Sequence, residues 1–385
     1  MSLVHFNHSG AGLPAPETLQ TITDYLRSEA EVGPMEASQL VGLQRAEIYE
    51  VAARLLGCGP QHVAFGSGHG QLYGDIISAI PLKGEDRVLV SRQEWMGNVI
   101  CLQNAARLSG ASLSLMASDD STAVDVEELC ANLSPDVRIL ALTWIGASGA
   151  LINPAAAIGR AIRQSRSSAF FIIDASQAIG QLPINVEELG CDALVACGRK
   201  FLRGPRGTAI AYISPRLAAE VVPRKLDNFS AAWNGKDVVQ VSDARVFETA
   251  EESVALRLGL GKAIEQALEL GLDNIREKLN HKASALRDAL AAQPKVQVLD
   301  LGKEKAACVT FTVGGLSCGQ VKRALADRGI TIGMNGSGYT PYDLELRGIT
   351  ELLRASVHMS TSDEDIETLV GAIAELTGTR GGLVN

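Results

Sequence analysis

The chain has 385 residues, a formal net charge of −9 and a hydrophobic fraction of 46%. This length and composition are enough for two domains with a sizeable buried core. No run of about 18 consecutive apolar residues occurs, and residues 1–12 lack the basic start and apolar run of a signal peptide. The acidic balance, without a long basic block, argues against nucleic acid and anionic membrane surfaces as partners.

Cysteine usage points to a reducing compartment. The chain has seven cysteines, an odd number, and no CxxC pattern. A disulfide framework or a structural zinc site is therefore not expected, and no metal ligands are predicted. We expect a cytoplasmic location.

Short apolar runs alternate with longer amphipathic stretches over the first part of the chain. The runs predict strands over residues 62–65, 87–91, 138–143, 169–173, 193–197 and 208–213. Helices are predicted between them, for example over 97–108 and 154–164. Continuous apolar strands that alternate with helices predict a mostly parallel sheet covered by helices on both faces.

From residue 251 onward the pattern changes. A helical pattern covers 251–270, and Gly271 breaks it before a second helix that runs to about residue 292. The remaining sequence predicts strands over 296–299, 308–313, 330–334 and 354–358 and helices over 319–327 and 363–376. This α+β pattern predicts a smaller second domain, residues 256–385, after a first domain of residues 1–255.

Ligands of open α/β sheets bind beyond the carboxyl ends of the strands, so the residues that follow each predicted strand matter most. Asp174 follows strand 169–173, and Lys200 follows strand 193–197. Asp174 is either a helix cap or the partner of a buried cation such as a pyridinium nitrogen. A lone lysine is usually solvated, but a lysine beside an apolar site can form a Schiff base. Neighbouring strand ends would bring the two groups into one crevice.

Three weaker signals lie at other strand ends. The turn Gly66-Ser67-Gly68-His69-Gly70-Gln71 precedes a predicted helix and could offer free N–H groups to a phosphate, although it could also be a plain turn. Trp95 could stack on a flat heterocycle or belong to the core. Arg354 could hold a carboxylate or form a surface ion pair.

Together these residues resemble the class V aminotransferase family, a branch of the fold-type I enzymes that use pyridoxal 5′-phosphate (PLP). The resemblance runs from HFNHSGAGLPAP to the helix that ends near Leu376, and its specific part is DASQAIGQLPINVEELGCDALVACGRKFLRGPRGT. It implies an α/β fold with a large PLP-binding domain on a mostly parallel seven-stranded sheet. It also implies a small C-terminal α+β domain, on which the N-terminal segment of the chain packs.

The resemblance also assigns residues to the cofactor and substrate. Lys200 would carry PLP and later move protons, Asp174 would keep the pyridine nitrogen protonated, and Gln177 would bond the ring oxygen O3′. Trp95 would stack on the ring, and Arg354 would bind the substrate carboxylate. The implied phosphate site comprises Gly68, His69, Gly70, Cys197, Arg199 and, from the partner of a homodimer with shared active sites, Ser253.

Some positions depart from the family pattern. Gly70 replaces a threonine and Cys197 replaces a serine or threonine, so two hydroxyls are missing from the phosphate site. Ser148 stands where related sequences often have asparagine, at the substrate end. The segments around Tyr73, 228–234 with Trp233, and 336–342 are expected to be loops that shape the substrate pocket.

The expected reaction is cleavage of a C–S bond. Cysteine desulfurases of this family need a cysteine on a mobile loop, but residues 330–349 contain none and Cys318 lies upstream. The segments GRKFLRGPRGT and FNHSGAGL are most similar to C–S lyases, such as the hercynylcysteine sulfoxide lyase subgroup, and to isopenicillin N epimerase-like proteins. We therefore expect β-elimination on a cysteine S-conjugate or its sulfoxide, which gives a thiol or sulfenate, pyruvate and ammonia.

Other activities stay open. An epimerase would need a second acid, for which Tyr73, Tyr339 and Tyr342 are candidates. An aminotransferase or a decarboxylating or deaminating enzyme of natural-product biosynthesis is also compatible with the scaffold. An NAD(P)-binding oxidoreductase is a different class, but GSGHGQ lacks the third glycine of the GxGxxG fingerprint. A non-catalytic scaffold would leave Lys200, Asp174 and Arg354 without a role.

Overall fold

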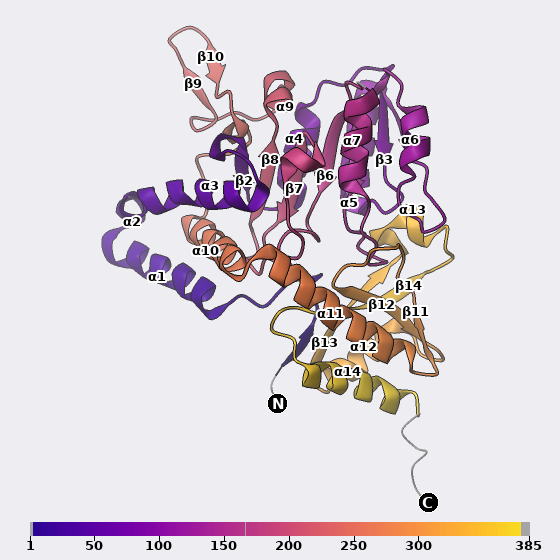
Figure 1. Cartoon of the computed structure of the whole chain (residues 1–385). Coiled ribbons are helices and arrows are strands. Elements are labelled where there is room, and N and C mark those ends of the chain that lie inside the picture. The colour runs from indigo at the N-terminus through magenta and orange to yellow at the C-terminus, as the bar shows by residue number, and fades with distance from the viewer. Residues whose placement is uncertain (1–2, 166, 379–385) are drawn as a thin grey trace, which may run out of the picture.

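The computed structural model of the protein describes residues 3–165 and 167–378. Its largest element is a seven-stranded sheet (Figure 1). The strand order is β2 (Val63–Gly66), β8 (Ala209–Ile213), β7 (Ala193–Cys197), β6 (Phe170–Asp174), β5 (Val137–Thr143), β3 (Arg87–Val90) and β4 (Ser112–Leu115). The neighbours from β7 to β4 are parallel, and β8 is antiparallel to both of its neighbours. The prediction of a mostly parallel seven-stranded sheet is confirmed.

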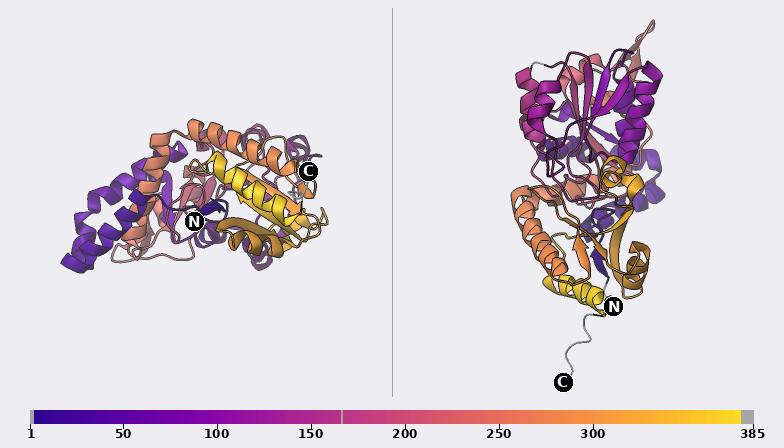
Figure 2. Two further views of the ribbon diagram at one scale, coloured as in Figure 1. Left: turned by 90° about the horizontal axis from the view of Figure 1, so that it is seen from below. Right: turned by 90° about the vertical axis from the view of Figure 1, so that its right-hand side faces the viewer.

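Helices cover both faces of this sheet (Figure 2, right). Because side chains alternate across a strand, Ile172 packs on one face with α4 (His69–Ala79) and α5 (Met96–Ser109), and Phe171 packs on the other face with α7 (Ala155–Ser165). The shorter helices of this part are α6 (Val126–Asn132), α8 (Val186–Leu189) and α9 (Pro215–Glu220).

A second sheet of five strands lies beside the first. Its order is β1 (Val4–Phe6), β13 (Ile330–Gly336), β14 (Glu351–Ser356), β12 (Cys308–Val313) and β11 (Val296–Val298). β1 comes from the N-terminus and pairs in parallel with β13. The accompanying helices are α11 (Leu272–Ala291), α12 (Cys318–Ala326), α13 (Pro341–Leu344) and α14 (Asp363–Leu376). The division into domains of residues 1–255 and 256–385 stays a prediction.

Several elements were not predicted. The helices α1 (Pro16–Val32), α2 (Pro34–Leu40) and α3 (Gly42–Leu56) project to one side, and α1 and α3 pack against α10 (Val254–Leu270) (Figure 1). A hairpin of β9 (Ala231–Trp233) and β10 (Val238–Gln240) projects from the same half of the molecule. No described helix combines the length and apolar character needed to cross a membrane.

Two predicted boundaries were wrong for identifiable reasons. The helix predicted from residue 251 begins at Val254, because the Ser253 side chain accepts a hydrogen bond from the Leu256 N–H and caps it. The strand predicted over residues 354–358 is Glu351–Ser356, because its antiparallel partners β12 and β13 fix its extent. Arg354 therefore lies inside a strand.

Candidate active site

A cavity of about 310 Å³ opens at the carboxyl ends of β6 and β7. Its walls come from three parts of the chain: the large sheet, the N-terminal segment with Asn7 and Ser9, and the small sheet with Asn335 and Arg354. This volume lies within the range of small-molecule sites, and the position is the one expected for an open α/β sheet.

Asp174 is the last residue of β6 and lines this cavity. Its Oδ1 accepts from the Ser176 N–H at 2.8 Å, and its Oδ2 accepts from Asn98 Nδ2 at 2.8 Å. Burial by itself raises the pKa of Asp174, but His69, Lys200 and the Ser176 N–H outweigh it and hold the pKa below its usual value. The carboxylate is therefore charged, fixed and available to a cation in the cavity.

Lys200 lies on the turn that follows β7, and it lines the same cavity. This turn is tightly packed: a Cβ at Gly12 would lie 2.5 Å from Lys200 O, and a Cβ at Gly180 would lie 2.5 Å from Leu202 N. Burial lowers the pKa of the Lys200 amine more than the nearby charge of Asp174 raises it, and the charges of Arg199 and Arg354 lower it further. A lysine held in this way is suited to act as a nucleophile and a base.

The glycine-rich turn leads into α4, as predicted, with His69 as the first helical residue. A Cβ at Gly68 or Gly70 would meet nothing within 4 Å, so there is room beside the helix N-terminus. The His69 side chain lies against Asp174, with Nε2 at 3.2 Å from Oδ1, and its ring stands edge-on to Trp95. The phosphate role of this turn stays a prediction.

The other predicted cofactor residues on these elements line the cavity as well. They are Trp95, Gln177, Cys197 and Arg199. Gln177 Nε2 donates to Ser9 O at 3.0 Å, and Arg199 donates to Gly10 O, so both side chains contact the N-terminal segment. The cavity is thus closed partly by residues that precede the first helix.

Arg354 reaches the cavity from β14. Its Nη1 donates to Ala147 O at 2.9 Å, and its buried Nε has no hydrogen-bond partner among the described residues. The buried Oδ1 atoms of Asn7 and Asn335, which also line the cavity, are unpartnered too. These polar atoms leave bonding capacity for a substrate at this end of the site.

Six predicted residues do not line this cavity. Two of them, Gly68 and Gly70, flank His69, which does line it. Tyr73 is buried inside α4 and stacks on His69, so the prediction of a loop there was wrong. Ser148 is buried behind the wall and accepts from Asn335 Nδ2. Trp233 lies on the projecting hairpin with 68% of its surface exposed.

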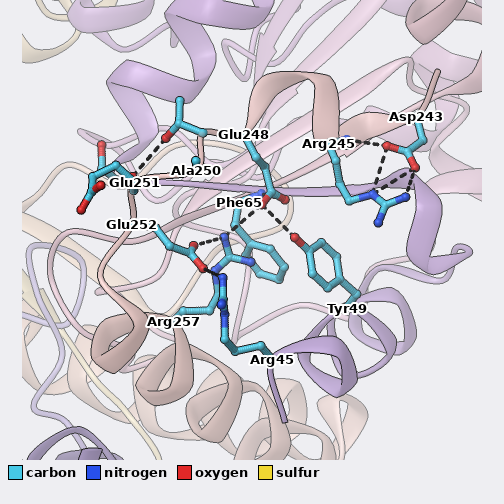
Figure 3. A network of polar contacts seen from close by, with 12 residues as sticks. Arg45, Tyr49, Phe65, Asp243, Arg245, Glu248, Ala250, Glu251, Glu252 and Arg257 are labelled. Carbon is cyan, nitrogen blue, oxygen red and sulfur yellow. Dashed lines mark hydrogen bonds and ion pairs between the residues drawn. The ribbon is translucent and has the colours of Figure 1, made fainter. Parts of the chain in front are cut away.

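Ser253 is the sixth, and it lines a separate cavity of about 460 Å³. This second cavity borders a buried polar network around Glu248 (Figure 3). Glu248 accepts from the Phe65 N–H at 2.9 Å, Tyr49 Oη at 2.8 Å and Arg257 Nη2 at 3.1 Å. The network therefore ties α3 and α10 to β2, immediately before the glycine-rich turn.

Sequence reasoning missed several residues of the site. Asn7 belongs to a segment that is brought to the cavity by the pairing of β1 with β13. No local sequence pattern predicts that Asn7 lies there. Lys322 reaches the cavity from α12 and was not predicted. Tyr339, a candidate second acid on the segment 336–342 that was expected to shape the pocket, lines the cavity as well. Glu94 and Asn98 follow β3 and are four positions apart. Because this spacing can bring two side chains together across one helical turn, the sequence could have predicted the contact between them.

The residues present fit PLP. Asp174 offers an ionised carboxylate to a pyridinium nitrogen, Lys200 offers an amine of lowered pKa, and Trp95 offers an aromatic face. The open space beside Gly68 and Gly70 at the N-terminus of α4 suits a phosphate.

Comparison with known proteins agrees with this geometry. The family model for aminotransferase class-V matches residues 5–369. The chain belongs to the class V aminotransferase family. It is a PLP-dependent enzyme, and its large sheet and flanking helices form the fold-type I architecture.

Members of this family with curated names include cysteine desulfurases. A protein of Xylella fastidiosa named probable cysteine desulfurase is 25% identical over 97% of this chain and 91% of its own length. A cysteine desulfurase of Synechococcus elongatus is 28% identical over 77% of this chain and 47% of its own length.

Two solved structures have the same fold. The cystine C–S lyase C-DES, in complex with its reaction product cysteine persulfide, has a TM-score of 0.88 at 20% identity and covers 97% of this chain and 98% of its own. The apo cysteine desulfurase of Thermococcus onnurineus has a TM-score of 0.87 at 20% identity, over 98% and 95% of the two chains.

Proposed function

We propose that this class V enzyme is a C–S lyase that performs β-elimination on a cysteine S-conjugate or its sulfoxide. The products would be a thiol or sulfenate, pyruvate and ammonia. The observation that carries the proposal is the composition of the cavity wall: it has the base Lys200 and the carboxylate clamp Arg354, and its one cysteine among the described residues is Cys197, at the end of β7.

Each residue has a defined task in this proposal. Arg354 binds the substrate α-carboxylate, and the Lys200 amine takes the Cα proton. Bound PLP supplies an electron sink for the charge that develops at Cα, and the Asp174 carboxylate supports this sink. The Cβ–S bond then breaks, and its electron pair leaves with the sulfur. The released aminoacrylate reacts with water to give pyruvate and ammonia.

A cysteine desulfurase is the second candidate, because the curated relatives carry that name. A desulfurase transfers sulfur to a protein cysteine and leaves alanine. Residues 330–349 offer no cysteine, and Cys318, at the start of α12, is only 3% exposed. Burial raises the pKa of the Cys318 thiol to about 11, so little nucleophilic thiolate would form.

The products formed from a substrate panel distinguish these reactions. The PLP-loaded protein is incubated with cysteine, cystine, S-alkyl cysteines and their sulfoxides, and pyruvate and alanine are measured. Pyruvate formation from a conjugate, abolished in Lys200→Ala, is the expected result. Alanine from cysteine would support the desulfurase instead. Exchange of the Cα proton with solvent and neither product would favour an epimerase, for which Tyr339 is the tyrosine that lines the cavity.

We further propose that the enzyme is a homodimer with shared active sites. Large apolar side chains are exposed on the projecting helices and hairpin: Met35 is 71% exposed, Leu43 is 84% exposed and Trp233 is 68% exposed. Such a surface favours an interface with a second copy of the chain.

Light scattering should give twice the chain mass. If the sites are shared, mixing Lys200→Ala with an inactive Trp233→Ala protein should restore part of the activity, and no restoration would contradict sharing.

A further inference from the structure

The most unusual group near the site is the Glu94 carboxylate. Glu94 is completely buried and forms no ion pair within the part of the chain that the structure describes, although buried carboxylates are normally paired with a cation. Burial raises the pKa of Glu94, and the nearby charge of Asp174 adds to this effect. Burial of a carboxylate without a cation costs free energy, so the presence of Glu94 here points to a role beyond packing.

Four donors surround this carboxylate. Oε1 accepts from Asn98 Nδ2 at 2.8 Å and from Thr143 Oγ1 at 2.9 Å. Oε2 accepts from the Thr143 N–H at 2.8 Å and from Ser91 Oγ at 2.9 Å. The Thr143 N–H and the Asn98 NH2 group can only donate, so an ionised Glu94 can accept from all four donors. The buried Oδ1 of Asn98 has no hydrogen-bond partner among the described residues.

Asn98 connects this cluster to the catalytic carboxylate. Its Nδ2 donates one hydrogen to Glu94 and the other to Asp174 Oδ2, at 2.8 Å each. A flipped amide would turn Oδ1 toward two carboxylate oxygens, so the two acceptors fix its orientation together. Glu94 thus reinforces the orientation in which Nδ2 of Asn98 faces Asp174.

We propose that Glu94 is a positioning residue that acts through Asn98 on Asp174. It holds the Asn98 amide so that an N–H, and not an oxygen, meets Asp174. This donor keeps Asp174 ionised and aimed at the cavity, and it thereby raises the proton affinity of the cofactor nitrogen opposite Asp174. The proposal depends on PLP binding in this cavity and is independent of the substrate.

The substitution Glu94→Gln has a predictable consequence. The Thr143 N–H belongs to the backbone and cannot move, so the new amide oxygen must accept from it. The new NH2 group then meets the Asn98 NH2 group, and this donor–donor contact is relieved only if the Asn98 side chain turns or moves away. Either change weakens the N–H donor to Asp174, and the protonated state of the cofactor nitrogen would lose part of its support.

The test measures the cofactor and needs no turnover. The holoenzyme is loaded with PLP labelled with 15N in the pyridine ring, and the 15N resonance reports the protonation of that nitrogen. We expect Glu94→Gln to move the resonance toward that of unprotonated pyridine by part of the shift seen in Asp174→Asn, because His69 still lies against Asp174. Asn98→Ala should move it partway in the same direction, and the double variant Glu94→Gln/Asn98→Ala should show no more than the Asn98→Ala shift.

Asp192→Asn is the matched control. Asp192 is a buried carboxylate of the same sheet that accepts from the Phe171 N–H and from Ser214, but it precedes β7 and so lies at the opposite end of the strands. Its neutralisation should leave the resonance unchanged. A loaded Glu94→Gln protein with the wild-type resonance would overturn the proposal. If Glu94→Gln does not fold, a wild-type resonance in Asn98→Ala would overturn it equally.

Discussion

At the residue scale, the substrate end of the site depends on the geometry of one arginine. Arg354 keeps an unpartnered buried Nε, while its Nη1 is fixed on Ala147 O. A lysine there could not form the two parallel bonds of a guanidinium to a carboxylate. Arg354→Lys should therefore raise KM about tenfold or more, roughly 1.4 kcal/mol, with a smaller change in kcat. Steady-state kinetics measure this, with exposed Arg323→Lys as the control; an unchanged KM would remove Arg354 from substrate binding.

The residue scale also marks how far the sequence could lead. Asp174, Lys200, Trp95 and Arg354 were predicted because each follows or occupies an apolar strand, and they line one cavity. Asn7 could not be found in this way, because the parallel pairing that brings it there joins residues more than 300 positions apart. Tyr73 was misjudged because it was assigned to a loop, although it belongs to the predicted helix after the glycine-rich turn and is buried there.

At the scale of the element, the turn that carries Lys200 is held by glycines. Gly180 has φ +81°, and a Cβ there would lie 2.5 Å from Leu202 N. Gly180→Ala should cost about 1–3 kcal/mol of stability and shift the turn, so that PLP is lost faster on dialysis. Denaturant unfolding and cofactor release measure both effects. Gly315→Ala is the control, since Gly315 also has a positive φ but its Cβ would meet nothing within 4 Å.

The sequence predicted elements best where their pattern was strongest. The strands Ala193–Cys197 and Cys308–Val313 and the helix Asp363–Leu376 have the predicted bounds. Helix α1 was missed because its apolar stripe is narrow: it buries only Thr18 and Tyr25, and both of its leucines, Leu19 and Leu26, are exposed. Such helices depend on tertiary contacts, here with α10, more than on their own periodicity.

At the scale of the whole molecule, a histidine cluster joins the N-terminus, the end of the small sheet and the Lys200 turn. His8 stacks on His358, whose Nε2 lies 3.1 Å from Phe201 O. Burial lowers the pKa of His8 to about 2 and that of His358 to about 4. Both are neutral in the folded protein, whereas the unfolded chain takes up these protons below about pH 6.5. Their contribution is complete above that pH and is lost as the pH falls.

The free energy of unfolding should therefore decrease from pH 7 to pH 5. His8→Asn should remove up to one of the protons that the chain takes up on unfolding. The slope of the unfolding free energy against pH should then fall by roughly 1.4 kcal/mol per pH unit. Urea titrations at several pH values measure the slope. The exposed His281 on α11 gives the control His281→Asn, which should leave the slope unchanged. An unchanged slope in His8→Asn would mean that His8 is not neutral in the folded protein.

The central claim is that Lys200 binds PLP covalently in this cavity. The visible absorbance spectrum of the purified protein, recorded beside that of Lys200→Ala, tests it most directly. We predict a yellow band in the wild type that is absent or shifted in the variant, while both remain folded. A wild type that stays colourless after PLP is added, or an identical band in both proteins, would contradict the account.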